Sequence, residues 1–187
     1  MTDPTCAKPS RRTLYLMLAL FFVPVAASFA LYYGIGWRPA GSTNHGELLQ
    51  PLRQLPASMA QPEGKWALVY AGDGACDAAC RHALYIGRQT HTLLNKDMGR
   101  VQRVLLATSN CCDREFLQQE HDGLLVRDVD GAGARGDLQA ALPPGDHSHH
   151  LFVVDPLRNV VLRFDTRENP RGLLDDMKKL LKLSQIG

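Results

Sequence analysis

The sequence predicts an α/β domain built on a mixed β-sheet with flanking helices and preceded by one N-terminal transmembrane helix. Three observations carry this prediction. Residues 13–37 form a run of 25 residues without a charged side chain. After it, short apolar segments typical of strands alternate with segments whose apolar residues recur at helical spacing. Residues 65–187 are long enough for one compact domain with its own core.

The uncharged run predicts a membrane anchor, because as a helix it can cross a bilayer core of roughly 30 Å. Basic residues in the tail 1–12 precede it and only Arg38 follows closely. This asymmetry predicts a cytoplasmic tail and a periplasmic C-terminal domain on a single-pass protein of the bacterial inner membrane. The alternative is a signal peptide cleaved at Ser28-Phe29-Ala30, but the run exceeds the roughly 7–15 residues of a signal h-region.

Charge excludes some classes of function. The chain carries a net charge of +2, and the tail 1–12 supplies three basic residues and one acidic residue, so the remainder balances 18 basic against 18 acidic residues. No basic footprint for nucleic acid is visible. The carboxylates form no paired acid–base constellation, so nothing suggests a hydrolase. The lipid bilayer is the first expected partner.

Residues 38–64 are rich in proline and glycine and show little periodicity. They are predicted to be a semi-extended stalk. Residues 44–49 are more specific in sequence than a spacer requires, so this part either packs on the domain or is a plain tether.

The domain is predicted to open with a buried strand over residues 65–70, ended by the turn Gly72-Asp73-Gly74. Residues 77–98 are predicted to form a helix, with Gly87 allowing close packing on a sheet. A second strand over residues 101–108 makes this a right-handed parallel unit.

The second half adds shorter elements and ends on a helix. Its predicted elements are a helix at 113–120, a strand at 124–128, a hairpin pairing 150–154 with 160–164, and a helix with Asn169 as N-cap and Pro170 at its first position. The resulting order of strands and helices is the thioredoxin-like arrangement, with helices on both faces of a mixed sheet.

Cys76 and Cys80 are the first candidates for chemistry, in Cys-Asp-Ala-Ala-Cys between the first strand and the first helix. Open α/β sheets place their sites at such junctions, and a helix N-terminus favours a thiolate. The alternative is a structural disulfide, which an exported protein can carry. Because so short a loop constrains the unfolded chain little, we predict redox-active thiolates or metal ligands instead.

Three residues separate these cysteines, whereas dithiol oxidoreductases of this fold use two. The wider spacing suits an ion held between two sulfurs, and copper as Cu(I) matches thiolates with imidazole as a third ligand. His147, just before the hairpin, is the best candidate for that ligand, with His149 and His150 as substitutes. The alternative is a solvated turn. The nearest prolines come too early for the cis-proline that oxidoreductases keep there.

These residues resemble the SCO copper chaperones of cytochrome c oxidase assembly, and the SCO-related membrane proteins of proteobacterial oxidase gene clusters. Members are single-pass anchored and thioredoxin-like, with Cys-x-x-x-Cys after the first strand and a distant Asp-His-Ser before an apolar strand that ends in Asp-Pro. Cys76, Cys80 and His147 fall on those positions, with His147 eight residues before Asp155. The resemblance covers about residues 63–187 and implies that these three residues bind copper, as Cu(I) or Cu(II).

The chain departs from the family pattern at Asp77 and Arg81, where a proline usually follows each motif cysteine. Cys111 and Cys112 have no counterpart in the pattern. They follow the second strand, so they should emerge at the same sheet edge as Cys76 and Cys80. They are candidate accessory residues: a resolving or relay pair, extra copper or zinc ligands, or inert or cross-linked thiols.

The resemblance implies a membrane-anchored, copper-binding assembly factor that assists copper-site maturation of cytochrome c oxidase. Its expected partner is an oxidase subunit with a copper site. Two alternatives stay open: a thiol–disulfide oxidoreductase that keeps a client's cysteines reduced, and a non-catalytic scaffold for oxidase assembly. Only the first of these alternatives would make the protein an enzyme.

Overall fold

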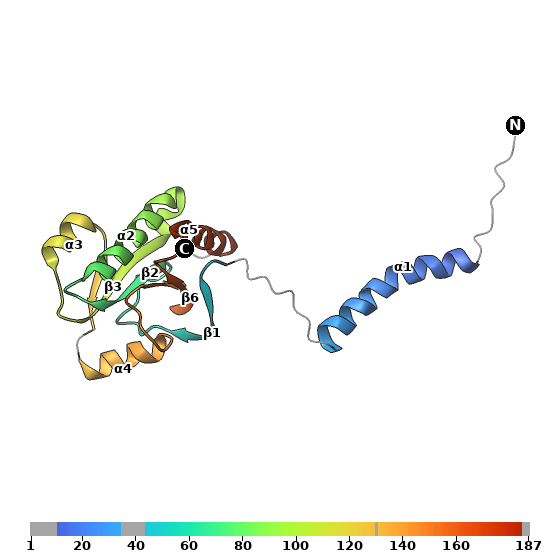
Figure 1. The fold of residues 1–187 in the computed structure, drawn as a ribbon, viewed down its shortest axis with the longest axis horizontal. Helices are drawn as coiled ribbons and strands as arrows, with labels where there is room; N and C mark the ends of the chain where they lie inside the picture. Colours follow the sequence, from blue (N-terminus) through green and yellow to red (C-terminus); the bar gives the residue numbers. More distant parts are fainter. Residues whose placement is uncertain (1–10, 35–43, 130, 185–187) are drawn as a thin grey trace, which may run out of the picture. The chain divides into compact units, whose positions relative to one another are not determined.

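The computed structural model describes residues 11–34, 44–129 and 131–184. The chain divides into two compact units, residues 1–42 and residues 43–187. The first unit contains α1 (Arg11–Phe29), which continues as the π-helix η1 (Ala30–Gly34). Within the described residues, Arg11–Gly34 is the single helix long and apolar enough to cross a membrane, and none of its side chains is buried. The predicted N-terminal apolar helix is thus present (Figure 1). The rest of the tail, with Cys6, and residues 35–37 lie outside the described residues.

The second unit is built on one six-stranded mixed sheet, whose strands are β1 (Glu47–Gln54), β2 (Trp66–Asp73), β3 (Val101–Ser109), β4 (Leu125–Asp128), β5 (His150–Val154) and β6 (Asn159–Asp165). Their order in the sheet is β1-β6-β5-β2-β3-β4. β2 and β4 run parallel to the strand between them, β3, while β5 is antiparallel to β2, β6 to β5 and β1 to β6.

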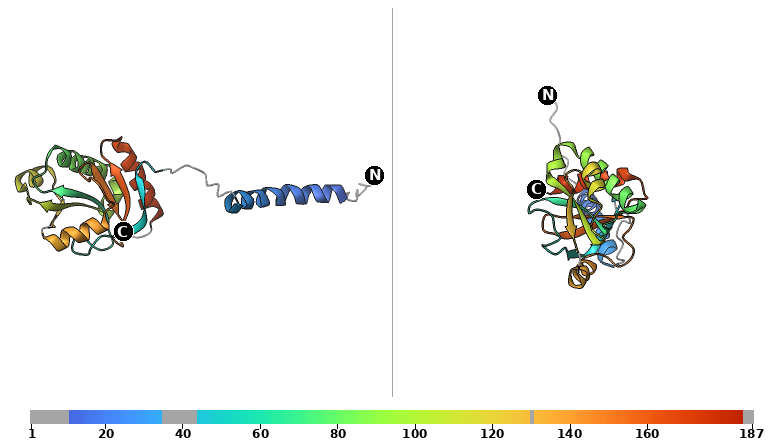
Figure 2. Two further views of the ribbon diagram at one scale, coloured as in Figure 1. Left: turned by 60° about the horizontal axis from the view of Figure 1, so that its bottom comes forward. Right: turned by 90° about the vertical axis from the view of Figure 1, so that its left-hand side faces the viewer.

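Helices cover both faces of this sheet, as predicted (Figure 2). α2 (Ala78–Leu93), α3 (Arg114–Glu120) and α5 (Pro170–Leu183) contribute to one apolar cluster, and α4 (Ala132–Ala141) contributes to a second cluster on the other face. We call the first face the α2 face and the second the α4 face. The mixed, thioredoxin-like sheet with flanking helices is confirmed.

Strand periodicity assigns side chains to the two faces. In β5, Leu151 and Val153 belong to the cluster on the α2 face, whereas Phe152 and Val154 belong to that on the α4 face. This is the alternation that a pleated strand imposes. Gly87 of α2 is buried, and a Cβ there would lie 3.7 Å from the side chain of Leu151. The expected close packing of this helix on the sheet is therefore present.

The predicted stalk is wrong from residue 47 onward. Residues 47–54 form β1, which pairs with β6, and Leu55, Met59 and Ala60 are buried on the α4 face. The proline and glycine content of this segment indicated a linker. Its strand is formed by hydrogen bonds to β6, more than 100 residues away in the sequence, which no local pattern could predict. Residues 38–43 of the predicted stalk lie outside the described residues.

The segment before β1 packs on the domain through α5. Asp176 is 1% exposed, and its carboxylate accepts the backbone N–H groups of His45 and Gly46 at 2.8 Å each. Gly172 lies so close to His45 that a Cβ there would meet the histidine Cβ at 2.7 Å. Of the two alternatives for residues 44–49, the structure selects packing.

Other boundaries differ in small ways. α2 ends at Leu93, and residues 95–100 turn into the 3₁₀ helix η2 (Asn95–Arg100), because Asn95 takes a left-handed conformation with φ of 51°. α4 was not predicted, since its glycines are poor helix formers. The last helix matches the prediction: Asn169 accepts the N–H of Arg171 at 3.0 Å, and Pro170 begins the helix.

Candidate dithiol and metal site

The turn after β2 fixes the position of Cys76. Asp73 accepts the N–H of Ala75 through its side chain at 2.8 Å and the N–H of Cys76 through its carbonyl at 3.1 Å. Cys76 itself lies in the left-handed region with φ of 52°, which is uncommon for a residue with a side chain. The turn therefore holds the first cysteine in a specific, sparsely populated conformation.

The start of α2 positions Cys80. Asp77 is the N-cap, and its carboxylate accepts the N–H of Cys80 at 2.9 Å. The next residue, Arg81, reaches back and donates its Nε–H to the carbonyl of Cys76 at 3.1 Å. Both residues that depart from the SCO pattern thus stabilise the cysteine loop.

Cys76 and Cys80, which we call the inner pair, form a disulfide with their Cα atoms 5.0 Å apart. The two residues are only 2% and 1% exposed and belong to the apolar cluster of the α2 face. The structure therefore describes the oxidised state, in which neither sulfur is free to bind a metal.

Tyr70 of β2 connects the inner pair to the loop before β5. It is buried on the α2 face, and its hydroxyl donates to the carbonyl of Ser148 at 3.2 Å. Burial, together with the negative charges of Asp77, Asp146 and Asp73, raises the pKa of Tyr70 to about 12. Because Tyr70 belongs to the same apolar cluster as Cys76 and Cys80 and also bonds Ser148, it ties the loop before β5 to the α2 face.

The ring of His147 points to the other face. It packs edge-on against Phe152 with ring centroids 5.3 Å apart, and it lines a cavity with Ala71 and Leu138 on the α4 face. Its Nδ1 atom is buried without a hydrogen-bond partner. Burial, with a smaller effect of His150, lowers its pKa, so the neutral imidazole is favoured.

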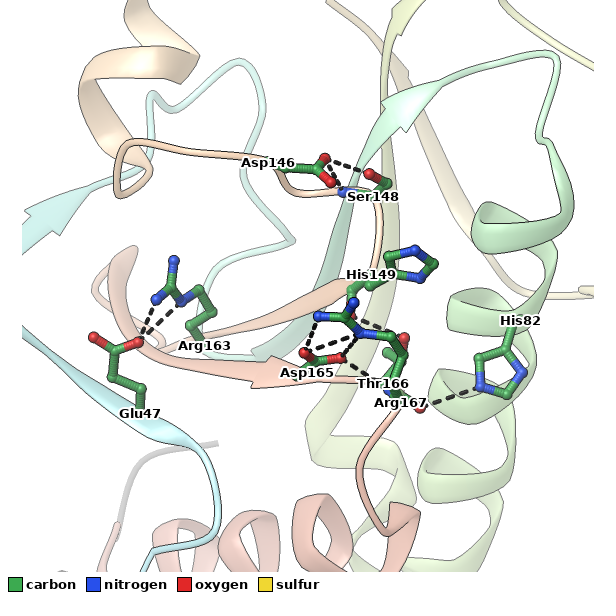
Figure 3. A network of polar contacts seen from close by, with 9 residues as sticks. All are labelled: Glu47, His82, Asp146, Ser148, His149, Arg163, Asp165, Thr166 and Arg167. Carbon is green, nitrogen blue, oxygen red and sulfur yellow. Dashed lines mark hydrogen bonds and ion pairs between the residues drawn. The ribbon is translucent and has the colours of Figure 1, made fainter.

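His149 lies on the side of the inner pair. Its carbonyl accepts from the backbone N–H and the hydroxyl of Thr166, at 2.8 and 2.9 Å. In Figure 3 its ring projects toward α2, where His82 contacts the carbonyl of Thr166 at 3.1 Å. His150 is the first residue of β5, and burial lowers its pKa; its Nδ1 atom is also buried without a partner.

Cys111 and Cys112, which we call the outer pair, follow β3 and are joined as a vicinal disulfide. Cys111 is exposed, whereas Cys112 is half-buried and packs against the cluster that contains the inner pair. Asn110 precedes them in the left-handed region, and Asp113 follows as the N-cap of α3, accepting the N–H of Phe116 at 3.2 Å.

The predicted ligands form no ready-made metal centre in this oxidised state. Among the described residues, no group of three or more histidine, cysteine or acidic side chains could hold a metal ion. The structure brings Cys76 and Cys80 together, places the His147 loop beside them and turns the His147 ring away. The donor chemistry of the inner pair nevertheless suits a soft ion once the disulfide is reduced.

Sequence reasoning missed three residues that shape this site. Tyr70 looked like an ordinary core residue of a strand, and Asp73 like part of a glycine turn. Arg81 followed a motif cysteine without any signal that its side chain would fold back. Asp73 had a usable signal, because aspartate in a tight turn commonly accepts backbone N–H groups two residues on.

A family model described as the transmembrane-like, thioredoxin-like, C-terminal domain matches residues 66–184. No curated protein matches the chain. The structure of yeast Sco1 with copper bound superposes with a TM-score of 0.57 at 17% identity, covering 74% of this chain and 95% of the chain in that structure. Arabidopsis thaliana ScoI with copper bound gives a TM-score of 0.55 at 16% identity, covering 65% and 87%. For Bradyrhizobium japonicum ScoI with copper bound the TM-score is 0.51 at 16% identity, covering 68% and 96%. At such identities these likenesses show a shared fold.

Proposed function

Because the chain belongs to this transmembrane-like, thioredoxin-like family, we propose that it is a membrane-anchored, copper-binding factor that assists maturation of a cytochrome c oxidase copper site. The observation that carries the proposal is the inner pair: two sulfurs at the carboxyl end of a central strand and the start of a helix. Copper-bound Sco proteins share the fold and support copper as the cargo. The N-terminal helix would hold the domain at the periplasmic face of a bacterial inner membrane, near a membrane-bound client.

Copper enters this proposal as a substrate that is bound and passed on. The Cys76–Cys80 disulfide must first accept two electrons and two protons, after which both thiols lose their protons to bind Cu(I). Asp77 keeps Cys80 in the first turn of α2, and Arg81 keeps Cys76 against that turn. These contacts would therefore keep the two sulfurs close together after the disulfide has been reduced.

Imidazole would complete the copper site. His147 remains the ligand that the resemblance implies, and for that role its ring must leave Phe152 and rotate to the α2 face. His149 projects toward α2 already (Figure 3). Both residues flank Ser148, whose carbonyl is held by Tyr70, so the loop itself is fixed beside the inner pair.

The test is copper stoichiometry in the full chain, purified in detergent, reduced and loaded with Cu(I). We expect about one copper per chain in the wild type and none in Cys76→Ser/Cys80→Ser. The imidazole ligand is identified by which of His147→Ala and His149→Ala lowers the affinity for copper. His91→Ala, in the last turn of α2 and thus at the other end of that helix from Cys80, is the control. Unchanged stoichiometry in the double cysteine variant would rule the proposal out.

The second candidate function is a thiol–disulfide oxidoreductase that keeps a client's copper-site cysteines reduced. The specific observation in its favour is the Cys76–Cys80 disulfide, which is the oxidised product of such a reaction. Turnover of a disulfide-bonded peptide with a dithiol reductant and no metal would support it. Normal oxidase assembly after loss of all four domain cysteines would instead leave only a scaffold role.

A further inference from the structure

The outer pair lies directly against the loop that carries the inner pair. Both loops leave the carboxyl ends of neighbouring parallel strands, with Asp73 of β2 in register with Ser109 of β3. Gly74 donates its N–H to the carbonyl of Ser109 at 2.7 Å, and its own carbonyl accepts the N–H of Asp113 at 3.0 Å. A Cβ at Gly74 would lie 2.6 Å from the Cα of Cys111. The two backbones are therefore in close contact.

Side chains strengthen this junction. The Asp73 carboxylate accepts from the hydroxyl of Ser109 at 3.0 Å and from the amide of Asn110 at 2.8 Å. The Arg81 guanidinium bonds the carbonyl of Cys76 and also the Asp113 carboxylate, at 3.1 Å each. One side chain thus links the residue that begins the inner pair to the residue that follows the outer pair.

The two pairs differ in access to solvent. The inner pair is almost wholly buried, so a protein reductant reaches its sulfurs less readily than those of the outer pair. The outer pair lines an open cavity of about 570 Å³ between α3 and β4, together with Leu117, His121, Leu124 and Val126. Cys112 also packs against the apolar cluster of the inner pair, so the outer pair faces both the solvent and the interior.

A structural role for the outer disulfide is weak. A bond between adjacent residues closes almost no loop, so it removes little entropy from the unfolded chain. The place of the outer pair beside the loop of the inner pair therefore indicates its role better than any contribution to stability does.

We propose that the outer pair is an internal electron relay that receives electrons from an external protein dithiol and reduces the inner disulfide. The inference rests on the proposed function, in which the inner pair must be reduced before it binds copper or acts on a client. The external donor is a dithiol protein of the thioredoxin chemical class, which becomes oxidised to a disulfide as the outer pair becomes a dithiol.

The internal step is a thiol–disulfide exchange. One outer thiolate attacks a sulfur of the Cys76–Cys80 bond, which breaks as a mixed disulfide forms, and the leaving inner thiolate takes up a proton. The second outer thiol loses its proton and attacks the outer sulfur of the mixed disulfide. The Cys111–Cys112 bond forms, the other inner thiolate is released and protonated, and two electrons have moved inward.

The first experiment traps the mixed disulfide in the full chain. In a Cys6→Ser background, four variants each keep one inner and one outer cysteine, with the other two changed to serine. After mild oxidation with diamide, we expect an intramolecular disulfide in at least one variant, identified by mass spectrometry of an unreduced digest. A chain with Cys80 as its one native cysteine and Leu157→Cys, in the exposed turn at the opposite ends of the strands, is the negative control. Absence of a cross-link in all four variants would overturn the relay.

The second experiment measures rates. With thioredoxin as the electron donor, Cys111→Ser/Cys112→Ser should slow reduction of the inner disulfide on the order of tenfold or more. Reduction by the small phosphine tris(2-carboxyethyl)phosphine tests whether the substitutions have changed the inner disulfide itself. The rate of this reduction in the variant should stay within about twofold of the wild-type rate. Equal thioredoxin rates in wild type and variant would contradict the relay.

These outcomes separate the relay from the proposed function. A chain whose outer-pair variant binds Cu(I) normally after phosphine reduction but is reduced slowly by thioredoxin supports both. Slow reduction by thioredoxin in a chain that binds no copper supports the relay and refutes the copper proposal. Loss of bound copper in the phosphine-reduced outer-pair variant would make Cys111 and Cys112 metal ligands and count against a purely redox role.

Discussion

The two cysteine loops use the same local devices and reach opposite degrees of exposure. Each follows a parallel strand, and each contains a left-handed residue, Cys76 in the first loop and Asn110 in the second. Each then places an aspartate, Asp77 or Asp113, as the N-cap of the next helix. Yet the inner pair is buried and Cys111 of the outer pair is exposed.

The position of the cysteines relative to the cap accounts for this difference. The inner pair brackets its N-cap, so Cys80 lies in the helix and faces the apolar cluster of the α2 face. The outer pair comes entirely before its N-cap and stays in the loop. The same strand–turn–helix structure thus buries a cysteine pair that lies on either side of the N-cap. It leaves accessible a pair that lies a few residues earlier, before the N-cap.

The largest expected effect is on thiol reactivity. In the fully reduced full chain, Cys111 should be alkylated faster than either inner cysteine by on the order of 100-fold, because a reagent reaches the inner pair only when its loop opens. Pulsed alkylation with iodoacetamide, read by peptide mass spectrometry, measures the four rates in one sample.

Partial denaturation is the control for this prediction. In urea near the unfolding midpoint the four rates should converge, since unfolding removes both the burial and the helix N-terminus that distinguish the inner pair. Comparable rates in the folded protein would mean that the inner pair is accessible and would remove the reason for a relay.

The next effect concerns the junction between the loops. Gly74→Ala places a Cβ within 2.6 Å of the Cys111 Cα, so the two loops must separate. Overpacking against backbone should lower the free energy of unfolding by about 1–3 kcal/mol, and the thioredoxin-driven reduction of the inner pair should slow.

Gly99→Ala is the matched control, because a Cβ at Gly99 meets no atom within 4 Å. Its unfolding free energy should stay within about 0.5 kcal/mol of the wild type, with an unchanged rate of inner-pair reduction. Chemical denaturation and the thioredoxin assay on the two variants make the comparison. A Gly74→Ala chain that matches the control in both measurements would show that the loops are not tightly joined.

Much of the inner-pair frame could be predicted from sequence because it is local. A buried strand, a glycine turn and a helix stripe are all encoded within residues 65–98, and they placed Cys76 and Cys80 at the strand–helix junction. The common sheet edge of the outer pair followed from one further step, since parallel neighbouring strands end on the same side. Both inferences needed only periodicity and chain direction.

Long-range partners and side-chain directions could not be predicted in this way. β1 depends on pairing with β6, and the anchoring of His45 depends on Asp176, so neither has a local pattern. The direction of the His147 ring depends on Phe152. The alternation of side chains in a strand predicts their direction only within the strand. β5 begins at His150, and His147 lies in the irregular loop before it.

A smaller effect is expected from Arg81, which links the two loops at the surface. Arg81→Ala removes its bonds to Cys76 and Asp113 and its stacking over the Phe116 ring, 3.9 Å from the ring centroid. Because the guanidinium and its carboxylate partner are partly solvated, the loss should be about 1 kcal/mol.

Arg81→Lys should recover part of this loss, since lysine keeps the charge without the planar fork. Arg88→Ala, which removes an exposed ion pair with Glu120, is the control that leaves the cysteine loops untouched. Denaturant unfolding and the rate of inner-pair reduction distinguish the variants. If Arg88→Ala slows reduction as much as Arg81→Ala does, the link between the loops is not the cause.

The smallest expected effect is a pH dependence that differs between the loops. His121 lines the cavity of the outer pair, and burial, followed by the charges of Arg103 and Arg88, lowers its pKa from 6.5. The unfolded chain therefore takes up the proton first, and stability is lost as the pH falls below about 6.5. The pKa of Asp73, at the base of the inner loop, is lowered from 3.8 chiefly by the N–H of Ala75, so its contribution is lost only as the pH falls below that value.

Two variants separate these pH windows in denaturant unfolding of the full chain between pH 8 and pH 3. His121→Phe keeps a ring against Phe116, whose centroid lies 5.1 Å from that of His121, and should reduce the loss of stability just below pH 6.5. Other histidines whose pKa is lowered by burial, such as His91, leave a residual slope there. Asp73→Asn should leave that region unchanged and flatten the curve below pH 3.8. Identical pH curves for His121→Phe and the wild type would mean that His121 does not contribute to the loss of stability below pH 6.5.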